Sequence, residues 1–429
     1  MAVINPYSGI NWTNTERILS VSHQHLSHNQ GETGGISYPQ KVFNDIYSTG
    51  VRHFAISRYR PSIPSYPFDY TSNTFPYVRN PFNATDDLQT LKAKYTVQID
   101  IPNDVIGSPN AEHINPIMKL NNRAYDWTCA HINAMGSLYE SGTTPVADGY
   151  KSTKIGTTYS DAIRSMISAL QYTDGGGVII NHAKWTHDEL VEKRSESYQY
   201  DVARFISDCL DLDSRVLGTD IIEGGRQDSL EYDEALIDSI LSTGRRCWIF
   251  CQGDWNRFRG RNELLIQPPS GATRAEKEYY CLKAYRDGAF FGRYANTNLS
   301  ISSISFYEST GTFSITAPNA DGIFVTIDGE STEYKSDSVT ITVPLTAKYV
   351  RAMAYKDRDD DPDWEYGDGD VYKDLVFTNP IMINPVTYQY DPAYDFDSGD
   401  DTEPDEGDSE DEDIPDQTPR SRFRTWLFG

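Results

Sequence analysis

Short apolar segments alternate with amphipathic helical patterns between Arg17 and Asn256, and this alternation limits the possible folds more than any other feature. Several of the short segments are apolar on both faces, which is typical of buried parallel strands. Apolar residues recur at spacings of three and four in the helical stretches Ser160–Tyr172, Tyr200–Leu212 and Tyr232–Thr243. We interpret seven segments as strands: Ile18–Ser22, Val51–Ser57, Tyr95–Ile101, Trp127–Asn133, Val178–Asn181, Asp220–Glu223 and Cys247–Cys251. Strand, helix and strand in succession predict an α/β fold, and seven such units fit a closed or nearly closed barrel.

The pattern changes after Arg293, where polar and apolar residues alternate and turn residues recur. This pattern predicts a small antiparallel β-sandwich. We expect its strands at Ser300–Phe306, Gly311–Ala317, Ile323–Asp328, Ser338–Val343 and Lys348–Tyr355. The predicted domains are a barrel over residues 1–293, a sandwich over 294–380, an acidic disordered linker over 381–416 and a docking peptide over 417–429.

The acidic charge is concentrated near the end of the chain. Of the net charge of −25, fourteen negative charges come from Asp391–Asp416, which contains no Lys or Arg, so the rest carries −11. Such a segment is expected to be disordered. The acidic body is expected to repel nucleic acid, so we do not expect direct nucleic-acid binding.

The last residues combine Arg420, Arg422 and Arg424 with aromatic side chains. On a flexible acidic tether, this composition favours a peptide that docks onto a protein partner. A frayed terminus is an equally good interpretation.

Five cysteines without a CxxC pair indicate reduced, buried thiols. The first residues do not resemble a signal peptide, and no segment is apolar enough to span a membrane. We therefore expect a cytoplasmic or virion-associated protein that does not bind membranes.

Histidines and carboxylates lie at the ends of the predicted strands. His23 and His25 are two residues apart, so in an extended chain their side chains point the same way. The carboxyl ends of parallel barrel strands converge on one rim, and nitrogen and oxygen ligands suit Zn, Mn or Fe. The candidate metal ligands, which are also the candidate catalytic residues, are His23, His25, Glu112, His131, His182 and Asp254. We expect a structural role for His53.

The order of these motifs resembles the polymerase-and-histidinol-phosphatase (PHP) family of metal-dependent phosphoesterases. The matching stretches are SVSHQH at 20–25, NAEH at 110–113, AHINAMGS at 130–137, GGGVIINHAKW at 175–185, VLGTDIIEGG at 216–225 and CQGDWN at 251–256. The resemblance implies a distorted barrel of seven β/α units that holds metal ions at its rim. It further implies that His23 and His25 bind one metal, that Glu112 bridges two metals, and that His131, His182 and Asp254 complete the set.

Two motifs depart from the family pattern. Ser57-Arg58-Tyr59 stands where the family has T-D-H, and Asn256 replaces the last histidine of D-x-H. We therefore expect one or two divalent ions, manganese, zinc or iron, rather than three.

The expected activity is hydrolysis of a small phosphomonoester or of a phosphodiester by metal-activated water. Arg58, Arg60 and Lys184 are candidates to bind the phosphate. The alternative is a PHP-like structural or binding protein with reduced catalysis, such as a viral particle component. Carbohydrate binding through the 29 tyrosines is supported by composition alone.

Overall fold

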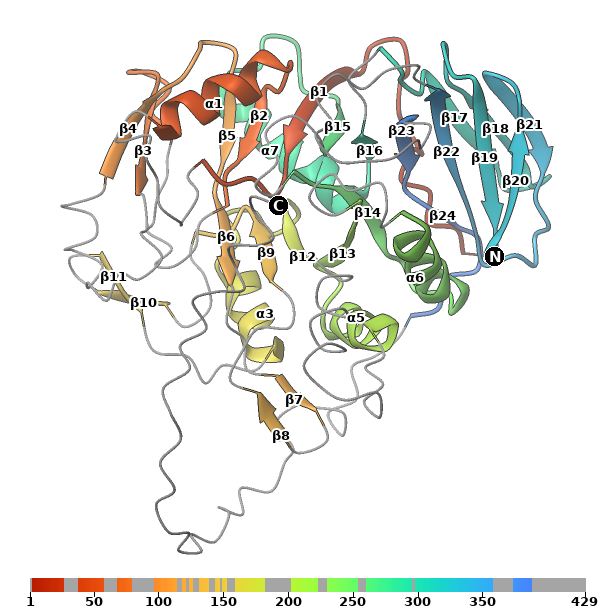
Figure 1. The fold of residues 1–429 in the computed structure, drawn as a ribbon, viewed down its shortest axis with the longest axis horizontal. Coiled ribbons are helices and arrows are strands. Elements are labelled where there is room, and N and C mark those ends of the chain that lie inside the picture. Colours follow the sequence, from red (N-terminus) through yellow and green to blue (C-terminus); the bar gives the residue numbers. More distant parts are fainter. Residues whose placement is uncertain are drawn as a thin grey trace, which may run out of the picture. The chain divides into compact units, whose positions relative to one another are not determined.

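The computed structural model describes residues 2–26, 38–57, 68–78, 96–113, 118–120, 123–125, 131–138, 143–146, 149–152, 159–181, 202–222, 230–253, 260–294, 298–357 and 373–387. Within these ranges lie two large open sheets, a smaller sheet and three separate two-stranded hairpins. Figure 1 shows their arrangement. The acidic segment 391–416 and the expected docking peptide 417–429 lie outside the described residues, so both stay predictions.

The larger sheet has ten strands and mixed direction. At one end β1, β2 and β5 are parallel, whereas the remaining neighbours are antiparallel. Its order is β20 (Glu330–Tyr334), β19 (Gly322–Ile327), β22 (Tyr349–Asp357), β23 (Lys373–Thr378), β16 (Phe290–Tyr294), β15 (Arg261–Ile266), β1 (Glu16–Val21), β2 (His53–Ala55) and β5 (Ile106–Ser108), with β24 (Ile381–Met382) beside β22.

The second sheet has five strands in the order β14 (Trp248–Cys251), β13 (Val216–Ile221), β12 (Gly177–Ile180), β9 (Ile132–Met135) and β6 (Asn110–His113). β12, β13 and β14 are parallel, as their apolar sequences suggest. β9, however, runs antiparallel to both of its neighbours. One strand of this sheet therefore opposes the direction that a parallel barrel requires.

The two sheets are connected where β5 leads into β6, with only Pro109 between them. A proline lacks the N–H group that a ladder needs, so a change of sheet at this position is physically reasonable. β14 also lies against β15 and β16, but among the described strands no backbone ladder joins the two sheets into a closed barrel. The expected closed (β/α)7 barrel is therefore wrong, because the described strands form open sheets of mixed direction.

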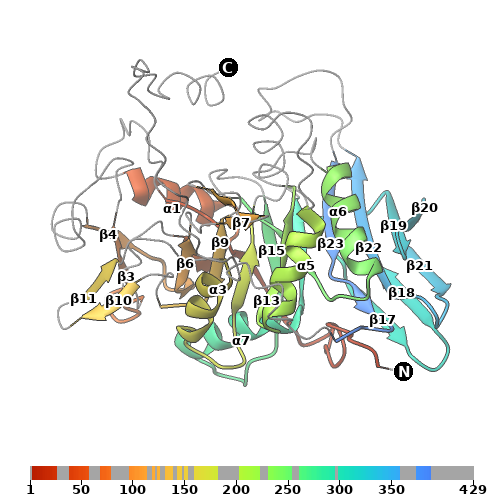
Figure 2. The same ribbon diagram turned by 90° about the horizontal axis from the view of Figure 1, so that it is seen from below.

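Helices cover one face of the five-stranded sheet (Figure 2). They are α3 (Tyr159–Ser168), α5 (Val202–Leu212) and α6 (Leu230–Ser242), and they share one apolar core with Val178, Ile180 and Ile249. The alternate residues Ile179 and Phe250 face a second core on the other side of the sheet. Burial of both strand faces explains the continuous apolar segments in the sequence.

The helix α7 (Arg274–Asp287) packs against β15 and β5 and contributes to the second core. Thr273 and Glu276 form a capping box at its start, and Gly288 ends it in a left-handed conformation with φ 75°. The remaining described helix, α1 (Tyr38–Ser48), packs near β4. None of the described helices has the length and apolar character that crossing a bilayer requires.

The antiparallel strands expected after residue 300 are present, in one sheet of three strands and in part of the ten-stranded sheet. The small sheet consists of β17 (Ser303–Tyr307), β18 (Thr312–Thr316) and β21 (Ser338–Thr342), and it shares an apolar core with β19 and β22. β16 pairs with β23, so hydrogen bonds cross the predicted boundary at residue 293. The strands β19, β22 and β23 thus belong to the same sheet as β1.

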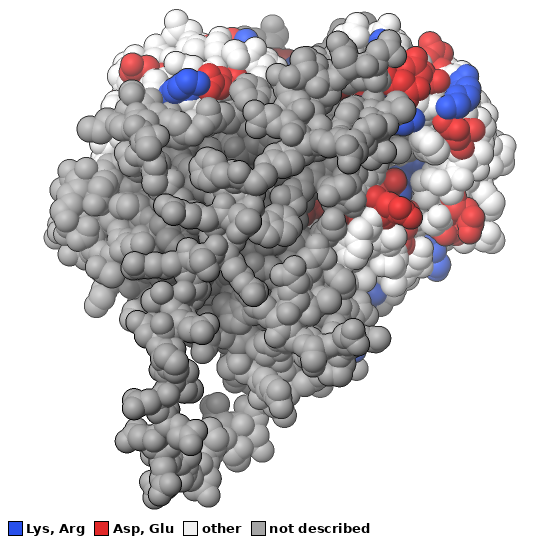
Figure 3. Space-filling view, viewed as in Figure 1, with Lys and Arg blue, Asp and Glu red and all other residues white. Residues whose placement is uncertain are grey.

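Charged side chains are interspersed over this region, as the right of Figure 3 shows where β17 to β22 lie in Figure 1. Lys335 pairs with Glu333 at 2.6 Å, and Lys373 pairs with Asp357 at 3.0 Å. The surface here therefore carries both signs of charge side by side.

The segment Tyr95–Ile101, which we expected to be a barrel strand, belongs to a hairpin. β4 (Thr96–Asp100) pairs antiparallel with β3 (Thr74–Val78). Residues of β4 are alternately exposed and buried, so only one of its faces is covered. Two further hairpins are formed by β7 (Met118–Leu120) with β8 (Arg123–Tyr125) and by β10 (Thr143–Val146) with β11 (Gly149–Ser152).

Candidate metal centre

The ends of three strands bring the candidate ligands together. β1 ends at Val21, and His23 and His25 follow it at once. Glu112 lies within β6. His131 directly precedes β9, whereas we expected it within the strand Trp127–Asn133. Because β9 is antiparallel to β6, the start of β9 lies at the same edge of the sheet as the end of β6.

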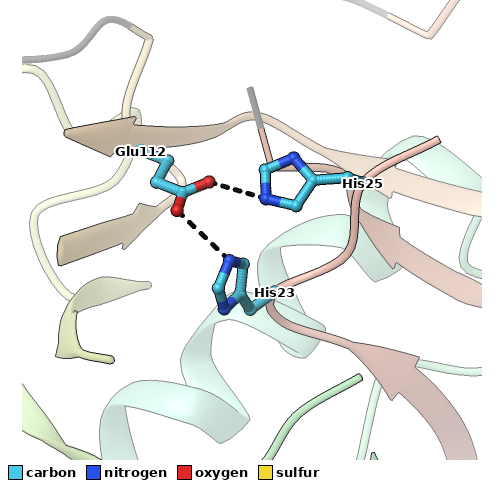
Figure 4. A group of neighbouring side chains, drawn as sticks. All are labelled: His23, His25 and Glu112. Atoms are coloured by element: carbon cyan, nitrogen blue, oxygen red, sulfur yellow. Dashed lines mark ion pairs between the residues drawn. The ribbon is translucent and has the colours of Figure 1, made fainter. Parts of the chain in front are cut away.

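The side chains of His23, His25 and Glu112 form a compact buried group (Figure 4). His25 Nε2 lies 3.0 Å from Glu112 Oε2, and His23 Nε2 lies 3.3 Å from Glu112 Oε1. One potential ligand atom from each residue lies within 4.8 Å of the other two. His131 adds a fourth side chain, with Nδ1 3.1 Å from Glu112 Oε1. We call these four residues the His/Glu cluster.

The cluster is withdrawn from solvent. The exposed fraction is 0% for His23, 2% for His25 and 0% for Glu112, whereas the His131 side chain retains 14%. A buried carboxylate needs strong partners to stay ionised. Burial raises the pKa of Glu112, but His25 and His23, when they are protonated, outweigh it and hold that pKa well below its usual range. The site therefore favours an ionised carboxylate surrounded by imidazoles.

Two imidazole nitrogens and a carboxylate oxygen are suitable ligands for a divalent cation. Neither Glu112 oxygen accepts a hydrogen bond of good geometry from the described residues, although imidazole nitrogens lie close to both. Nitrogen and oxygen atoms about 3 Å apart are close enough to bind one cation together. The group can therefore hold one metal ion.

Gln252, which sequence analysis did not identify, contacts the cluster from β14. Its side-chain Oε1 lies 2.9 Å from His23 Nδ1. An amide oxygen accepts a hydrogen bond, so this contact favours the tautomer with the proton on Nδ1 and leaves Nε2 as an electron-pair donor toward Glu112. The position two residues before Asp254 was the only signal in the sequence that could have indicated this role.

A second group that we missed is a buried network of amides beneath the cluster. Asn110 donates through Nδ2 to the Ser22 carbonyl at 2.7 Å and to the Ala55 carbonyl at 2.9 Å. Asn133 donates to Ser57 Oγ at 2.7 Å, and Asn181 donates to Asn133 Oδ1. These bonds connect the ends of β1, β2, β6, β9 and β12, so they fix the relative positions of the segments that carry the ligands.

The structure places four of the predicted ligands together: His23, His25, Glu112 and His131. His182 and Asp254 lie outside the described residues, as do the candidate phosphate-binding residues Arg58, Arg60 and Lys184. Those five assignments stay predictions.

His53 has surroundings that agree with the structural role we expected. It is fully buried, with Nδ1 2.6 Å from Ser20 Oγ and Nε2 2.9 Å from Ser108 Oγ. Burial lowers the pKa of His53 to about 3, so its imidazole is neutral at ordinary pH.

Comparison with known protein families, with curated proteins and with solved structures finds no match for this chain. The chemical character of the His/Glu cluster therefore has to be argued from its own geometry.

Proposed function

We propose that this chain is a metal-dependent hydrolase that binds one divalent cation, manganese, zinc or iron, at the His/Glu cluster and hydrolyses a phosphoester. The observation that carries the proposal is the convergence of His23, His25 and Glu112 within 4.8 Å at the ends of strands from two sheets. The phosphoester as substrate class is suggested by the resemblance of the surrounding motifs to PHP phosphoesterases.

Each residue of the cluster has a defined part in the proposal. His23 and His25 offer neutral nitrogen donors, and Glu112 supplies the negative charge that a divalent cation requires in a buried site. Gln252 holds the His23 ring in its donor tautomer. A divalent cation at this position would polarise a phosphoryl oxygen and lower the pKa of water toward neutrality.

His131 is the candidate ligand with the greatest exposure to solvent. Its side chain is the most exposed of the four, at 14% compared with 1% or less for the others. We infer that substrate approaches from the His131 side, because the other three side chains have almost no contact with solvent.

A second candidate function is a structural or binding protein whose metal stabilises the fold without turnover. The near-complete burial of His23, His25 and Glu112 favours it, because catalytic metal sites keep a position open to water and substrate. The viral particle component considered from the sequence belongs to this class.

The two candidates are distinguished by metal content and hydrolysis in the same samples. We expect elemental analysis to find one divalent ion per chain in the wild type, and none in the double variant His23→Ala/His25→Ala. We expect the metal-loaded wild type to hydrolyse p-nitrophenyl phosphate or bis(p-nitrophenyl) phosphate. The rate of the double variant should be lower by at least about 100-fold. The matched control is His53→Gln, because it removes a buried imidazole outside the cluster.

Three outcomes are informative. One bound ion with hydrolysis supports the enzyme. One bound ion without hydrolysis of either ester supports the structural alternative. An equal metal content in the wild type and the double variant contradicts both.

A further inference from the structure

A cavity of about 330 Å³ lies at the opposite ends of the strands that lead to the His/Glu cluster. Its lining includes Glu16, the first residue of β1, Arg52 just before β2, Ile106 at the start of β5 and Arg274 at the start of α7. Because β1, β2 and β5 are parallel, all three present their amino ends here. We call this space the amino-end cavity. It shares no lining residue with the His/Glu cluster.

Positive charge predominates in the lining. Three cationic side chains, Arg52, Arg274 and Lys277, face two carboxylates, Glu16 and Asp104, whereas Arg17 directs its guanidinium away from the cavity, toward Glu263 and Ser300. In a chain with a net charge of −25, a local excess of cations around a cavity is a marked exception. Such a concave site attracts small anions, since low-dielectric walls concentrate the field of the charges.

Two of these cations, Lys277 and Arg52, each have one carboxylate partner, and both pairs are partly exposed. Lys277 Nζ lies 2.7 Å from Glu16 Oε1, and Arg52 Nε lies 2.7 Å from Asp104 Oδ2. All four of these side chains retain between 26% and 54% exposure, so their heads are accessible to a ligand. The partner of Arg17 is Glu263, which is shared with Arg293.

Arg274 is the third cation, and its described hydrogen bonds go to neutral acceptors. They are Asn73 Oδ1 at 2.7 Å and the carbonyl oxygens of Tyr70 at 3.1 Å, Pro102 at 3.2 Å and Val105 at 3.4 Å. Within the described part of the chain, Arg274 forms no ion pair with a carboxylate. Its positive charge is therefore held in a fixed position at the start of α7, where the helix dipole adds positive potential.

We propose that the amino-end cavity binds the phosphate group of a small phosphorylated molecule. A phosphate carries up to two negative charges and several acceptor oxygens, which suits the cations that approach from Arg52 beside β2 and from α7. The volume exceeds what one phosphate needs, leaving room for the organic part of a small ester. The proposal does not depend on the metal centre, because the two sites lie at opposite ends of β1.

The test is a calorimetric titration of the full chain with inorganic phosphate. It is done in EDTA at constant ionic strength, so that phosphate held by a metal is not counted. We expect one saturable site in the wild type. In Lys277→Gln, which loses a charged contact, the affinity for phosphate should be at least about tenfold lower than in the wild type. The matched control is Lys41→Gln, because Lys41 also lies on a helix and also pairs with a carboxylate at 2.7 Å.

A substitution that removes a negative charge from the cavity provides a second test, because its expected effect on phosphate affinity is the opposite. Glu16→Gln removes a negative charge from the cavity, so we expect it to strengthen phosphate binding, whereas Asp45→Asn at the control pair should not. Thermal unfolding of each variant checks that it is folded. Arg52→Gln provides a second loss-of-charge variant in case Lys277→Gln is unstable.

The proposal is overturned by either of two results. One is the absence of saturable binding at phosphate concentrations up to about 10 mM. A dissociation constant above this concentration would be weaker than that of most specific ligand sites. The other is an equal effect of Lys277→Gln and Lys41→Gln, which would mean that phosphate responds only to the total charge of the chain.

Discussion

Two buried polar clusters can be compared, one at the junction of α6 with β22 and the other at the candidate metal centre. In the first, which we call the α6 charge cluster, Arg351 contacts Asp238 through two nitrogens, at 2.8 and 2.7 Å, and Glu234 at 2.9 Å. Tyr349 donates its hydroxyl proton to Asp238 at 2.7 Å. In the second, one carboxylate, Glu112, lies among three imidazoles.

The two clusters differ in how the negative charge of their carboxylates is balanced. The α6 charge cluster contains a permanent cation in bidentate contact with a carboxylate, so the protein supplies both signs of charge itself. The His/Glu cluster contains one permanent negative charge and side chains that are electron-pair donors when neutral. We infer that the first cluster stabilises the packing of α6 on the large sheet, and that the second is built to receive a cation.

The largest predicted effect is at the α6 charge cluster. Arg351→Met removes a cation that is 2% exposed and leaves Asp238 and Glu234 without it, so we expect a loss of about 3 kcal/mol in the free energy of unfolding. Urea denaturation measures it. The control is Arg204→Met on α5, where the side chain is 62% exposed and a change below about 0.5 kcal/mol is expected. Equal effects of the two substitutions would contradict the assigned role of Arg351.

At the His/Glu cluster, stability should depend on metal. A divalent cation at 100 times its dissociation constant should raise the free energy of unfolding of the wild type by about 2.7 kcal/mol. We expect no such increase in Glu112→Gln, because the substitution removes the only carboxylate of the cluster. Arg351→Met should keep the full increase, since separate sites contribute independently. Thermal unfolding with and without Mn²⁺ or Zn²⁺ tests this contrast, and an undiminished increase in Glu112→Gln would refute it.

Gln252 should affect the metal affinity of the His/Glu cluster, although it is not one of the four residues of the cluster. Gln252→Leu removes the acceptor for His23 Nδ1, and we expect metal affinity to fall about 10- to 100-fold. Gln252→Glu keeps an acceptor at the same position and should retain most of the affinity. Calorimetric titration with Zn²⁺ measures both variants. If the two variants bind equally weakly, the contact with His23 has no orienting role.

A buried imidazole without a carboxylate provides the smallest of these effects over the first pH unit below about 6.5. The pKa of His53 is about 3 in the folded chain and near 6.5 when unfolded. The unfolded chain therefore binds a proton first, and stability falls as the pH drops from about 6.5 toward 3. The slope contributed by His53 is about 1.4 kcal/mol per pH unit. His53→Gln should lack this contribution, so its stability should vary less with pH than that of the wild type over this interval. Identical slopes would show that His53 does not stay neutral in the fold.

Several features could be predicted because their signals are local. The spacing of two between His23 and His25 places both rings on one side of an extended segment, and the structure brings them to the same carboxylate. The helices α3, α5 and α6 follow from amphipathic periodicity.

Other features depend on contacts between distant segments. A strand buried on both faces has the same apolar pattern in either direction, so nothing in Ile132–Met135 indicates that β9 is antiparallel. The amides Asn110, Asn133 and Asn181 could not be recognised as a buried network, because asparagine is usually a surface residue. The closed barrel was wrong for the same reason: strand direction and sheet membership depend on tertiary pairing.

The most direct measurement of the central claim is anomalous diffraction from a crystal of the full chain soaked with Mn²⁺ or Zn²⁺. The account predicts one strong peak at bonding distance, about 2.0–2.3 Å, from Nε2 of His23, Nε2 of His25 and a carboxylate oxygen of Glu112. A peak bound to other residues, or no peak at a concentration that saturates the metal-dependent rise in stability, would contradict it.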